Sequence, residues 1–210
     1  MKKDKLSLLA LIEAAKSYEG SFGDFLLKYN ADELETTPEE LLMQMKDMLK
    51  VMRASIEHGL TGVKSRSQLT GGDAKKLLAA TGEDKFAHIL GDRALDAVIF
   101  ATAVGECNAA MGRIVAAPTA GAAGVLPGVL FSLAKHYDLT DDELAKGLVV
   151  AGTIGMVIGT RASLAGATGG CQAECGSAGA MAAGAAVSML GGTPEEVGTA
   201  VAIVFKNILG

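Results

Sequence analysis

Hydrophobic positions recur with the period of an α-helix along most of the chain. In segments 6–15 and 41–52 the apolar residues lie three and four positions apart, and segment 94–111 continues in the same way up to Gly112. No segment shows the strict alternation of a half-buried strand, and the β-branched residues in the run 148–150 do not change this. The pattern therefore predicts an all-α fold.

Three motifs of the capping-box type mark helix starts. In the motif at 37–40, the Thr37 hydroxyl can accept a hydrogen bond from the amide of Glu40, and the Glu40 carboxylate can accept one from the amide of Thr37. Pro38 suits the first helical position. The motifs at 140–143 and 193–196 have a similar form. Together they predict helices from residue 38 to the glycines at 59 and 62, over roughly 144–158, and over roughly 195–207.

Glycine and alanine form a stripe at three- and four-residue steps, made up of Gly176, Gly179, Ala183 and Gly184. We expect a helix to start at Ser177 and to carry this stripe. Because a glycine in a helix interior costs about 1 kcal/mol relative to alanine, this many glycines need compensation from close packing or from a ligand. The sequence predicts a compact helical domain with closely packed Gly/Ala-rich central helices.

Charged side chains become sparser toward the C-terminus. Residues 1–60 carry more of them than residues 114–210, although the second segment is longer. We therefore expect surface helices in the first part and a buried core in the second. A chain of 210 residues can bury one core. The prediction is a single domain over 1–210, with a more polar helical part at 1–60 and the functional core at 61–210.

Composition argues against several classes of protein. The net charge is −5 and the lysines and arginines are scattered, which argues against a nucleic-acid partner. The charge-free segment 114–134 is long enough to cross a membrane, but its prolines, glycines and small side chains favour buried structure in a soluble protein. Three cysteines and an N-terminus without a signal-peptide pattern indicate the reducing cytoplasm.

Two of the three cysteines, Cys171 and Cys175, lie four residues apart among glycines. Neighbours without bulk let a large group approach a thiolate, and the helix N-terminus expected at Ser177 would favour its negative charge. The alternative is that both are small core residues, as we expect for Cys107 in the apolar run 94–111. A zinc site would need a second cysteine pair, which the sequence lacks.

A polar loop bounded by glycines is predicted at 61–72, and it carries Lys64 and Arg66. A guanidinium binds a carboxylate through two parallel hydrogen bonds, so these cations could hold the carboxylate of a substrate. The alternative is a solvated loop without a ligand.

Segment 108–124 predicts a helix end near Asn108, a short extended piece and a new helix start. Thr119 is the expected N-cap, and the amides from Gly121 to Gly124 would offer donors to a carboxylate. A capped corner without a ligand explains the same pattern.

Three segments together resemble the iron–sulfur-dependent L-serine dehydratases, in particular the alpha chain of the two-chain bacterial form. The segments are 65–72, 108–127 and 169–184, and the similarity runs over essentially the whole chain. The resemblance implies β-elimination of water from L-serine, giving pyruvate and ammonia, with an open iron of a 4Fe-4S cluster as Lewis acid. It also implies a beta chain as partner and an oligomeric assembly.

The resemblance also gives roles to individual residues. It makes Cys171 the first of three cluster ligands, Lys64 and Arg66 carboxylate contacts, and Asn108, Thr119 and Gly121 substrate-side contacts. Cys175 falls where relatives commonly have no cysteine, and Ala120 where many have asparagine. In the family the other two cluster cysteines would follow Gly210 and the proposed base lies in the beta portion. We therefore expect a truncated alpha chain that holds no intact cluster by itself.

A second class of function fits the same pattern. In a non-catalytic helical scaffold or interaction subunit, the Gly/Ala stripe would be only a surface for a partner.

Overall fold

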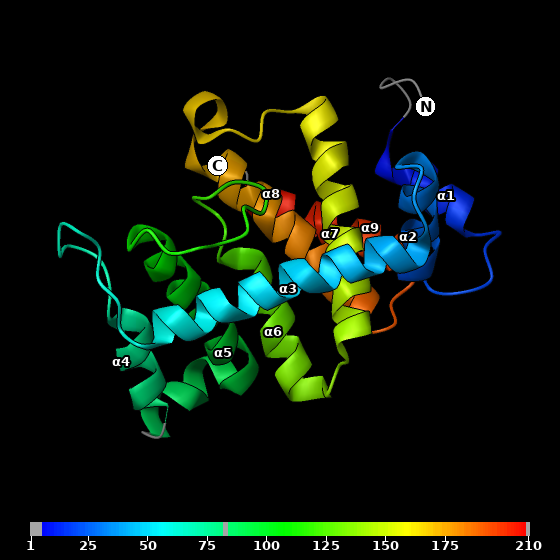
Figure 1. Cartoon of the computed structure of the whole chain (residues 1–210). Helices are drawn as coiled ribbons and strands as arrows, with labels where there is room; N and C mark the ends of the chain where they lie inside the picture. Colours follow the sequence, from blue (N-terminus) through cyan, green and yellow to red (C-terminus); the bar gives the residue numbers. More distant parts are fainter. Residues whose placement is uncertain (1–5, 82–83, 209–210) are drawn as a thin grey trace. The chain divides into compact units, whose positions relative to one another are not determined.

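Regular structure in this chain is helical. The structure is a computed structural model that describes residues 6–81 and 84–208, and within those ranges it contains nine α-helices and no β-strand (Figure 1). The predicted all-α fold class is confirmed. The chain divides into two compact units: unit 1 consists of residues 1–47 and 141–210, and unit 2 of residues 48–140. The single-domain expectation stays a prediction.

Unit 1 is built around one central helix. Helix α8 (Gly166–Met189) packs against both α7 (Asp141–Arg161) and α9 (Pro194–Ile208), as the orange, yellow and red ribbons of Figure 1 show. Helix α2 (Phe22–Glu33) packs on α7, and α1 (Leu8–Ala15) packs on α9.

Small residues allow the close approach of α7 and α8. A Cβ added at Gly184 of α8 would overlap the Ile154 side chain of α7, and one at Gly155 of α7 would lie 3.1 Å from Met181 of α8. The missing side chains therefore set the separation of the two helices. This confirms the predicted close packing of Gly/Ala-rich central helices.

Unit 2 contains most of α3 (Pro38–Leu60), together with α4 (Asp73–Ala80), α5 (Asp84–Ala109) and α6 (Val125–Tyr137). Helix α5 packs against α4 and α6. A Cβ at Gly59 of α3 would overlap the Ala103 backbone of α5, and a Cβ at Gly124, just before α6, would overlap the Ala101 carbonyl of α5. Close backbone approach therefore also shapes unit 2.

Local capping signals gave the correct start for two helices. The Thr37 and Thr193 hydroxyls accept hydrogen bonds from the amides of Glu40 and Glu196, at 3.1 and 3.2 Å. In each box the glutamate carboxylate accepts a hydrogen bond from the amide of the threonine. Helices α7 and α9 extend slightly beyond the predicted ranges.

The sequence analysis did not predict α2 or α4, and its helix start at Ser177 is wrong. Helix α8 begins at Gly166, and its break lies at Gly170, which has φ 75° and ψ 176°. The Ser177 hydroxyl instead bonds back to the carbonyl of Ala173 within the helix, at 2.6 Å.

Segment 114–134 does not form one long helix, because residues 112–116 have no regular secondary structure and α6 begins only at Val125. Among the described residues, α7 is the one helix long and apolar enough to pass a membrane-span test of length and composition. Buried residues make up 61% of its most apolar window, and a core helix of a soluble protein passes the same test.

Candidate functional site

The loop at 61–72 in unit 2 is held in shape by Ser65, which is buried. The Ser65 amide donates to the Thr70 carbonyl at 2.8 Å, and its hydroxyl accepts from the Thr70 amide at 3.2 Å. Lys64 and Gly71 form an isolated antiparallel bridge, and a Cβ at Gly71 would overlap the Val63 carbonyl. The loop is therefore a defined hairpin-like turn rather than an open coil.

The two cations predicted to hold a carboxylate project from this turn. Lys64 and Arg66 are both exposed, and neither forms an ion pair with another residue in the described part of the chain. Leu69 in this turn is 89% exposed, so its apolar side chain is left largely uncovered by the described residues. The turn thus presents two unpaired positive charges on a fixed backbone.

Glu106 of α5 anchors the chain just after this turn, and the sequence analysis did not identify this role. Its Oε1 accepts hydrogen bonds from the amides of Asp73 at 2.6 Å and Ala74 at 3.3 Å, the first residues of α4. The residue before α4, Gly72, has no side chain to cap the helix. Glu106 therefore supplies the cap from another helix, and a lone glutamate in the apolar run 94–111 was the signal for it.

The C-terminal end of α5 also holds the corner at 117–121. The Asn108 side chain donates to the Ala120 carbonyl at 3.0 Å, which brings Asn108 to the segment that carries Thr119 and Gly121. The predicted N-cap at Thr119 is wrong, because α6 begins at Val125 with Gly124 as its N-cap residue. A series of turns occupies 117–124, so the Gly121 amide belongs to a turn rather than to the helix end.

Two buried side-chain oxygens lack a hydrogen-bond partner within the described ranges, and both belong to this part of unit 2. They are Glu106 Oε2 and Thr119 Oγ1. Glu106 as a whole is 3% exposed. Because buried polar groups normally have a partner, unsatisfied ones indicate a water molecule or ligand that satisfies them. These two oxygens make Glu106 and Thr119 candidates for contact with a ligand, and Asn108 is linked to the segment of Thr119 through the Ala120 carbonyl.

The cysteine pair belongs to unit 1. Cys171 follows directly after the break at Gly170 and begins the long helical part of α8, with Cys175 one turn later. Both side chains are exposed and their Sγ atoms lie 3.7 Å apart. Partial desolvation, together with the hydrogen bond and charge of Cys171, raises the pKa of Cys175. Because both side chains are exposed, the alternative that Cys171 and Cys175 are small core residues is wrong.

Cys107 in unit 2 is a core residue, as predicted. It is 1% exposed, burial raises the pKa of its thiol, and its Sγ lies 3.8 Å from the Arg113 carbonyl. Among the described residues, no group of three or more His, Cys, Asp or Glu side chains could hold a metal ion. The described residues therefore do not by themselves provide the ligands of an iron–sulfur cluster.

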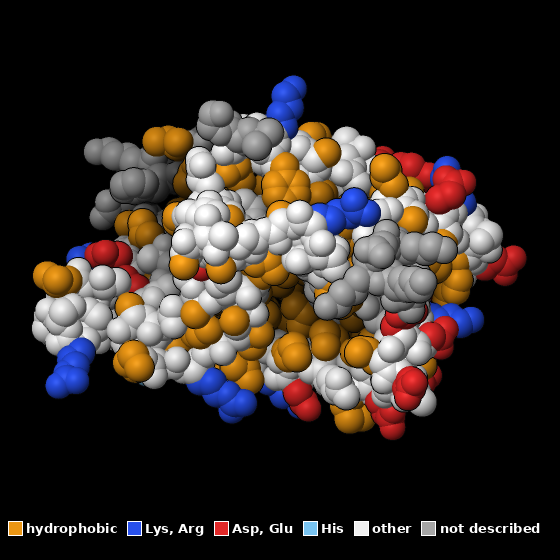
Figure 2. All heavy atoms as spheres, turned by 90° about the horizontal axis from the view of Figure 1, so that it is seen from above, with side chains coloured by type: hydrophobic (Ala, Val, Ile, Leu, Met, Phe, Trp, Pro, Cys, Tyr) orange, Lys and Arg blue, Asp and Glu red, His pale blue; other side chains and the backbone are white. Residues whose placement is uncertain are grey.

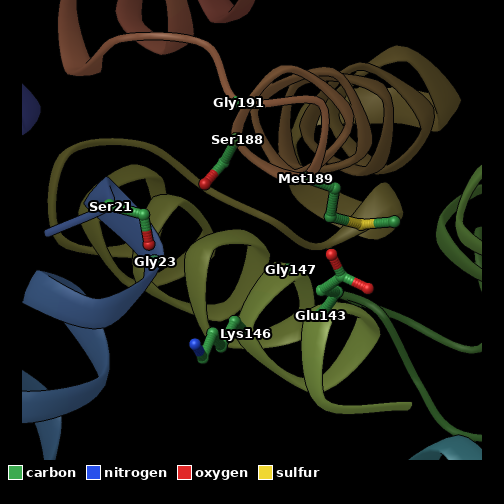
Figure 3. Close-up of a pocket in the computed structure, with 8 residues that line it drawn as sticks. All are labelled: Ser21, Gly23, Glu143, Lys146, Gly147, Ser188, Met189 and Gly191. Carbon is green, nitrogen blue, oxygen red and sulfur yellow. The ribbon is translucent and has the colours of Figure 1, made fainter. Parts of the chain in front are cut away.

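A pocket of about 250 Å³ with a mixed polar and apolar lining lies elsewhere in unit 1, between the start of α2, the first half of α7 and the end of α8 (Figure 3). Figure 3 shows Ser21, Ser188 and Glu143 projecting oxygen atoms from three different segments. The cation of the pocket, Lys146, is paired with Asp24 at 2.5 Å. None of the six predicted site residues lines this pocket.

The fold and the two sets of residues define a class: an all-helical protein with closely packed glycine-rich helices, an exposed cysteine pair and a polar cluster at a helix end. Comparison with known families makes the class specific. The chain belongs to the serine dehydratase alpha chain family, which matches residues 4–210.

Individual relatives carry the same description. The chain is 46% identical to the "Probable L-serine dehydratase, alpha chain" of Bacillus subtilis, over 95% of this chain and 66% of the relative. It is 39% identical to the "L-serine dehydratase, alpha chain" of Peptoniphilus asaccharolyticus, over 89% of this chain and 64% of the relative. "L-serine dehydratase 2" of Escherichia coli is 37% identical over 82% of this chain and 39% of its own length. The chain thus spans less than two thirds of these relatives.

Proposed function

We propose that this chain acts as the alpha chain of an L-serine dehydratase, a lyase. The observation that carries the proposal is the family match over residues 4–210, supported by relatives named for this activity. The reaction removes the α-proton and the β-hydroxyl group of serine to give aminoacrylate and water. Aminoacrylate then tautomerises and hydrolyses to pyruvate and ammonia, so no external oxidant or reductant is required.

In this proposal the turn at 61–72 binds the substrate carboxylate. Arg66 would hold the two carboxylate oxygens through parallel hydrogen bonds, with Lys64 adding a second positive charge. Three observations support these roles: both side chains are exposed, both lack an ion-pair partner among the described residues, and Ser65 fixes the backbone between them. A fixed backbone lowers the entropy lost when the carboxylate binds.

Asn108, Thr119 and Gly121 would contact the rest of the substrate. The unpaired Thr119 hydroxyl is the group in this set that a substrate atom could satisfy directly. The Asn108 amide already donates to the Ala120 carbonyl, so in the proposed site it also fixes the corner that carries the other two residues. No residue of this chain is assigned as the base.

We propose Cys171 as a ligand of a 4Fe-4S cluster, whose open iron would supply Lewis acidity for departure of the hydroxyl group. Support comes from its place in the resemblance and from its exposed thiol beside residues without bulk. The remaining ligands would have to come from outside the described residues. Cys175 is not assigned to the cluster.

A beta chain is the proposed partner, within an oligomeric assembly. Two of the relatives are themselves named alpha chains, which for those proteins implies a second chain. Apolar side chains lie uncovered in each unit, among them Leu9 and Ile203 in unit 1 and Leu69 and Met111 in unit 2. Figure 2 shows hydrophobic side chains interspersed with charged ones on one face of the molecule. Such groups are available for contact with a partner.

The carboxylate contact is tested by Arg66→Lys and Arg66→Ala in the assembled dehydratase, with Lys28→Ala as a control. Lys28 is an exposed cation of α2, so its removal changes net charge without touching the turn. We expect a KM for L-serine raised at least tenfold by Arg66→Ala and less by Arg66→Lys, because lysine keeps the charge but loses the bidentate geometry. An unchanged KM for Arg66→Ala would remove Arg66 from the site.

The cluster assignment is tested by anaerobic reconstitution with iron and sulfide, in the presence of the segments that complete the ligand set. Cys171→Ser should lose bound iron and the brown absorbance, whereas Cys175→Ser should keep most of both. Equal losses would show that the assignment between the two cysteines is wrong. A preparation that remains colourless with both cysteines intact would favour the scaffold function instead.

A further inference from the structure

The exposed cysteine pair has a geometry that the cluster assignment does not use. Metal ligation as proposed needs Cys171 alone, yet Cys175 places a second sulfur 3.7 Å from the first. Residues four apart on a helix lie side by side on one face, so the two thiols remain neighbours as long as α8 is intact. The pair is therefore set up for a reaction between the two sulfurs.

We propose that Cys171 and Cys175 form a reversible intramolecular disulfide. The oxidant is a small-molecule disulfide such as oxidised glutathione. One cysteine thiolate attacks it, forming a mixed disulfide and releasing one glutathione thiol. The second cysteine then attacks the mixed disulfide, forming the Cys171–Cys175 bond and releasing the second glutathione. Two protein thiols are oxidised and one glutathione disulfide is reduced, so electrons and protons balance.

Accessibility and local backbone freedom support the step. Both side chains are exposed, so a molecule of the size of glutathione can reach them. A disulfide needs its Cβ atoms about 4 Å apart, whereas helix neighbours at this spacing lie about 5–6 Å apart. Cys171 must therefore move toward Cys175 before the bond can close.

The break at Gly170 permits this movement. Cys171 is the first residue after a non-helical glycine with φ 75°, and a Cβ placed on that glycine would meet no atom within 4 Å. A glycine at this position can absorb a change in backbone angles, so Cys171 can move relative to the rest of the long helical part. Since the bond forms at an exposed site and distorts a helical turn, we expect it to be easily reduced, as strained and exposed disulfides are.

Oxidation would control the proposed cluster site. A cysteine ligates a metal as a thiolate, so the disulfide withdraws Cys171 from the ligand set until it is reduced. This consequence rests on the proposed function, whereas formation of the disulfide does not. Cys175 would then protect the ligand cysteine from irreversible oxidation while no cluster is bound.

The test is peptide mass spectrometry of the intact 210-residue chain after anaerobic incubation with oxidised glutathione. Free thiols are alkylated in denaturant without reduction, and the chain is digested with trypsin. Cleavage after Arg161 and Lys206 yields one peptide that holds both cysteines, whereas Cys107 lies in the peptide 94–113 and serves as internal control.

For the wild-type chain we expect the peptide 162–206 to carry no alkyl group and to be two hydrogen atoms lighter than the same peptide with two free thiols. After mild reduction and alkylation, the peptide should carry two alkyl groups. Cys171→Ser and Cys175→Ser should instead carry one stable glutathione adduct each, because the second attack is lost. A wild-type peptide that keeps a glutathione adduct, or that remains doubly alkylated, would overturn the proposal.

A second measurement separates this proposal from the proposed function. Iron content is compared after reconstitution of the oxidised and the reduced chain, in the presence of the segments that complete the ligand set. Iron uptake by the reduced form alone supports control of the site, whereas equal uptake by both forms overturns that control. Uptake by neither form counts against the cluster, and the mass measurement still decides whether the disulfide forms.

Discussion

Replacing Glu106 tests whether a buried carboxylate holds the start of α4 and, through it, the turn that carries the proposed carboxylate contacts. Glu106→Ala removes the acceptor of two backbone amides, those of Asp73 and Ala74. Hydrogen bonds to charged acceptors contribute about 1.5–3 kcal/mol each, and loss of an N-cap costs about 0.5–2 kcal/mol. The unpaired Oε2 of the native carboxylate offsets part of this, because alanine removes that buried unsatisfied atom.

We therefore expect Glu106→Ala to lower the free energy of unfolding by about 2 kcal/mol. Glu106→Gln should cost less, about 1 kcal/mol, since the amide oxygen can still accept while the NH₂ group occupies the place of the unpaired oxygen. Glu57→Ala, an exposed glutamate of α3 in the same unit, is the matched control and should change stability by less than about 0.5 kcal/mol.

Urea unfolding measures the global effect, and amide hydrogen exchange measures the local one. A local loss of about 2 kcal/mol corresponds to roughly 30-fold faster exchange at the Asp73 and Ala74 amides in Glu106→Ala. Equal exchange rates in Glu106→Ala and wild type would refute the capping role, even if the protein were destabilised overall. A substitution that raises the exchange rate more at these two amides than at other amides of unit 2 would support the capping role.

Three further changes test the packing and charge arguments. Gly59→Ala should lower the free energy of unfolding in urea by about 1–3 kcal/mol, because the new Cβ overlaps the backbone of α5. Gly105→Ala should raise it by about 0.5–1 kcal/mol, because a Cβ at this helix position meets no other atom. Two changes of the same sign would contradict the packing argument. Burial raises the pKa of Asp24, but hydrogen bonds from Lys146 and Ser21 lower it more, to below its ordinary value of 3.8. The ionised Asp24 carboxylate therefore stabilises the folded state fully above pH 3.8, and this contribution is lost as the pH falls through the lower folded pKa. The free energies of unfolding of wild type and Asp24→Asn should accordingly converge as the pH is lowered. A difference that does not change with pH would argue against the ion pair. Thr193→Ala should cost about 1 kcal/mol and Thr193→Ser much less in thermal unfolding, since serine keeps the accepting hydroxyl; equal losses would exclude the cap.

The sequence predicted those parts of the site whose signals are local. The cysteine pair was found because its two members lie four residues apart, and the loop at 61–72 because glycines bound it. The capping boxes at Thr37 and Thr193 were found for the same reason, since both partners lie within one helical turn. The helix end near Asn108 was predicted correctly, since α5 ends at Ala109. Thr119 was misassigned as N-cap, because turns precede α6 and the helix begins only at Val125.

The role of Glu106 shows what local signals miss. Its partners, the Asp73 and Ala74 amides, lie 33 and 32 residues away in the chain. Glu106 lies in the apolar C-terminal part of α5, and nothing nearby in the sequence shows which amides its carboxylate accepts from. Glu57, of the same residue type, is exposed. Only the packing of α5 against α4 distinguishes the two.

By itself the sequence determined that the chain is helical, where several helices begin, and which family the chain resembles, and it supplied the candidate site residues that are still predictions. Those features depend on residue type and on spacings of three or four positions, which a helix converts directly into neighbours. The tertiary structure alone decided that Gly170 breaks α8 just before Cys171, that Asn108 holds the Ala120 carbonyl, and that Glu106 caps α4. The roles of Asn108 and Glu106 depend on contacts between segments that are distant in the sequence, and these contacts form only when the helices pack. The break at Gly170 depends on backbone angles that glycine permits but does not require.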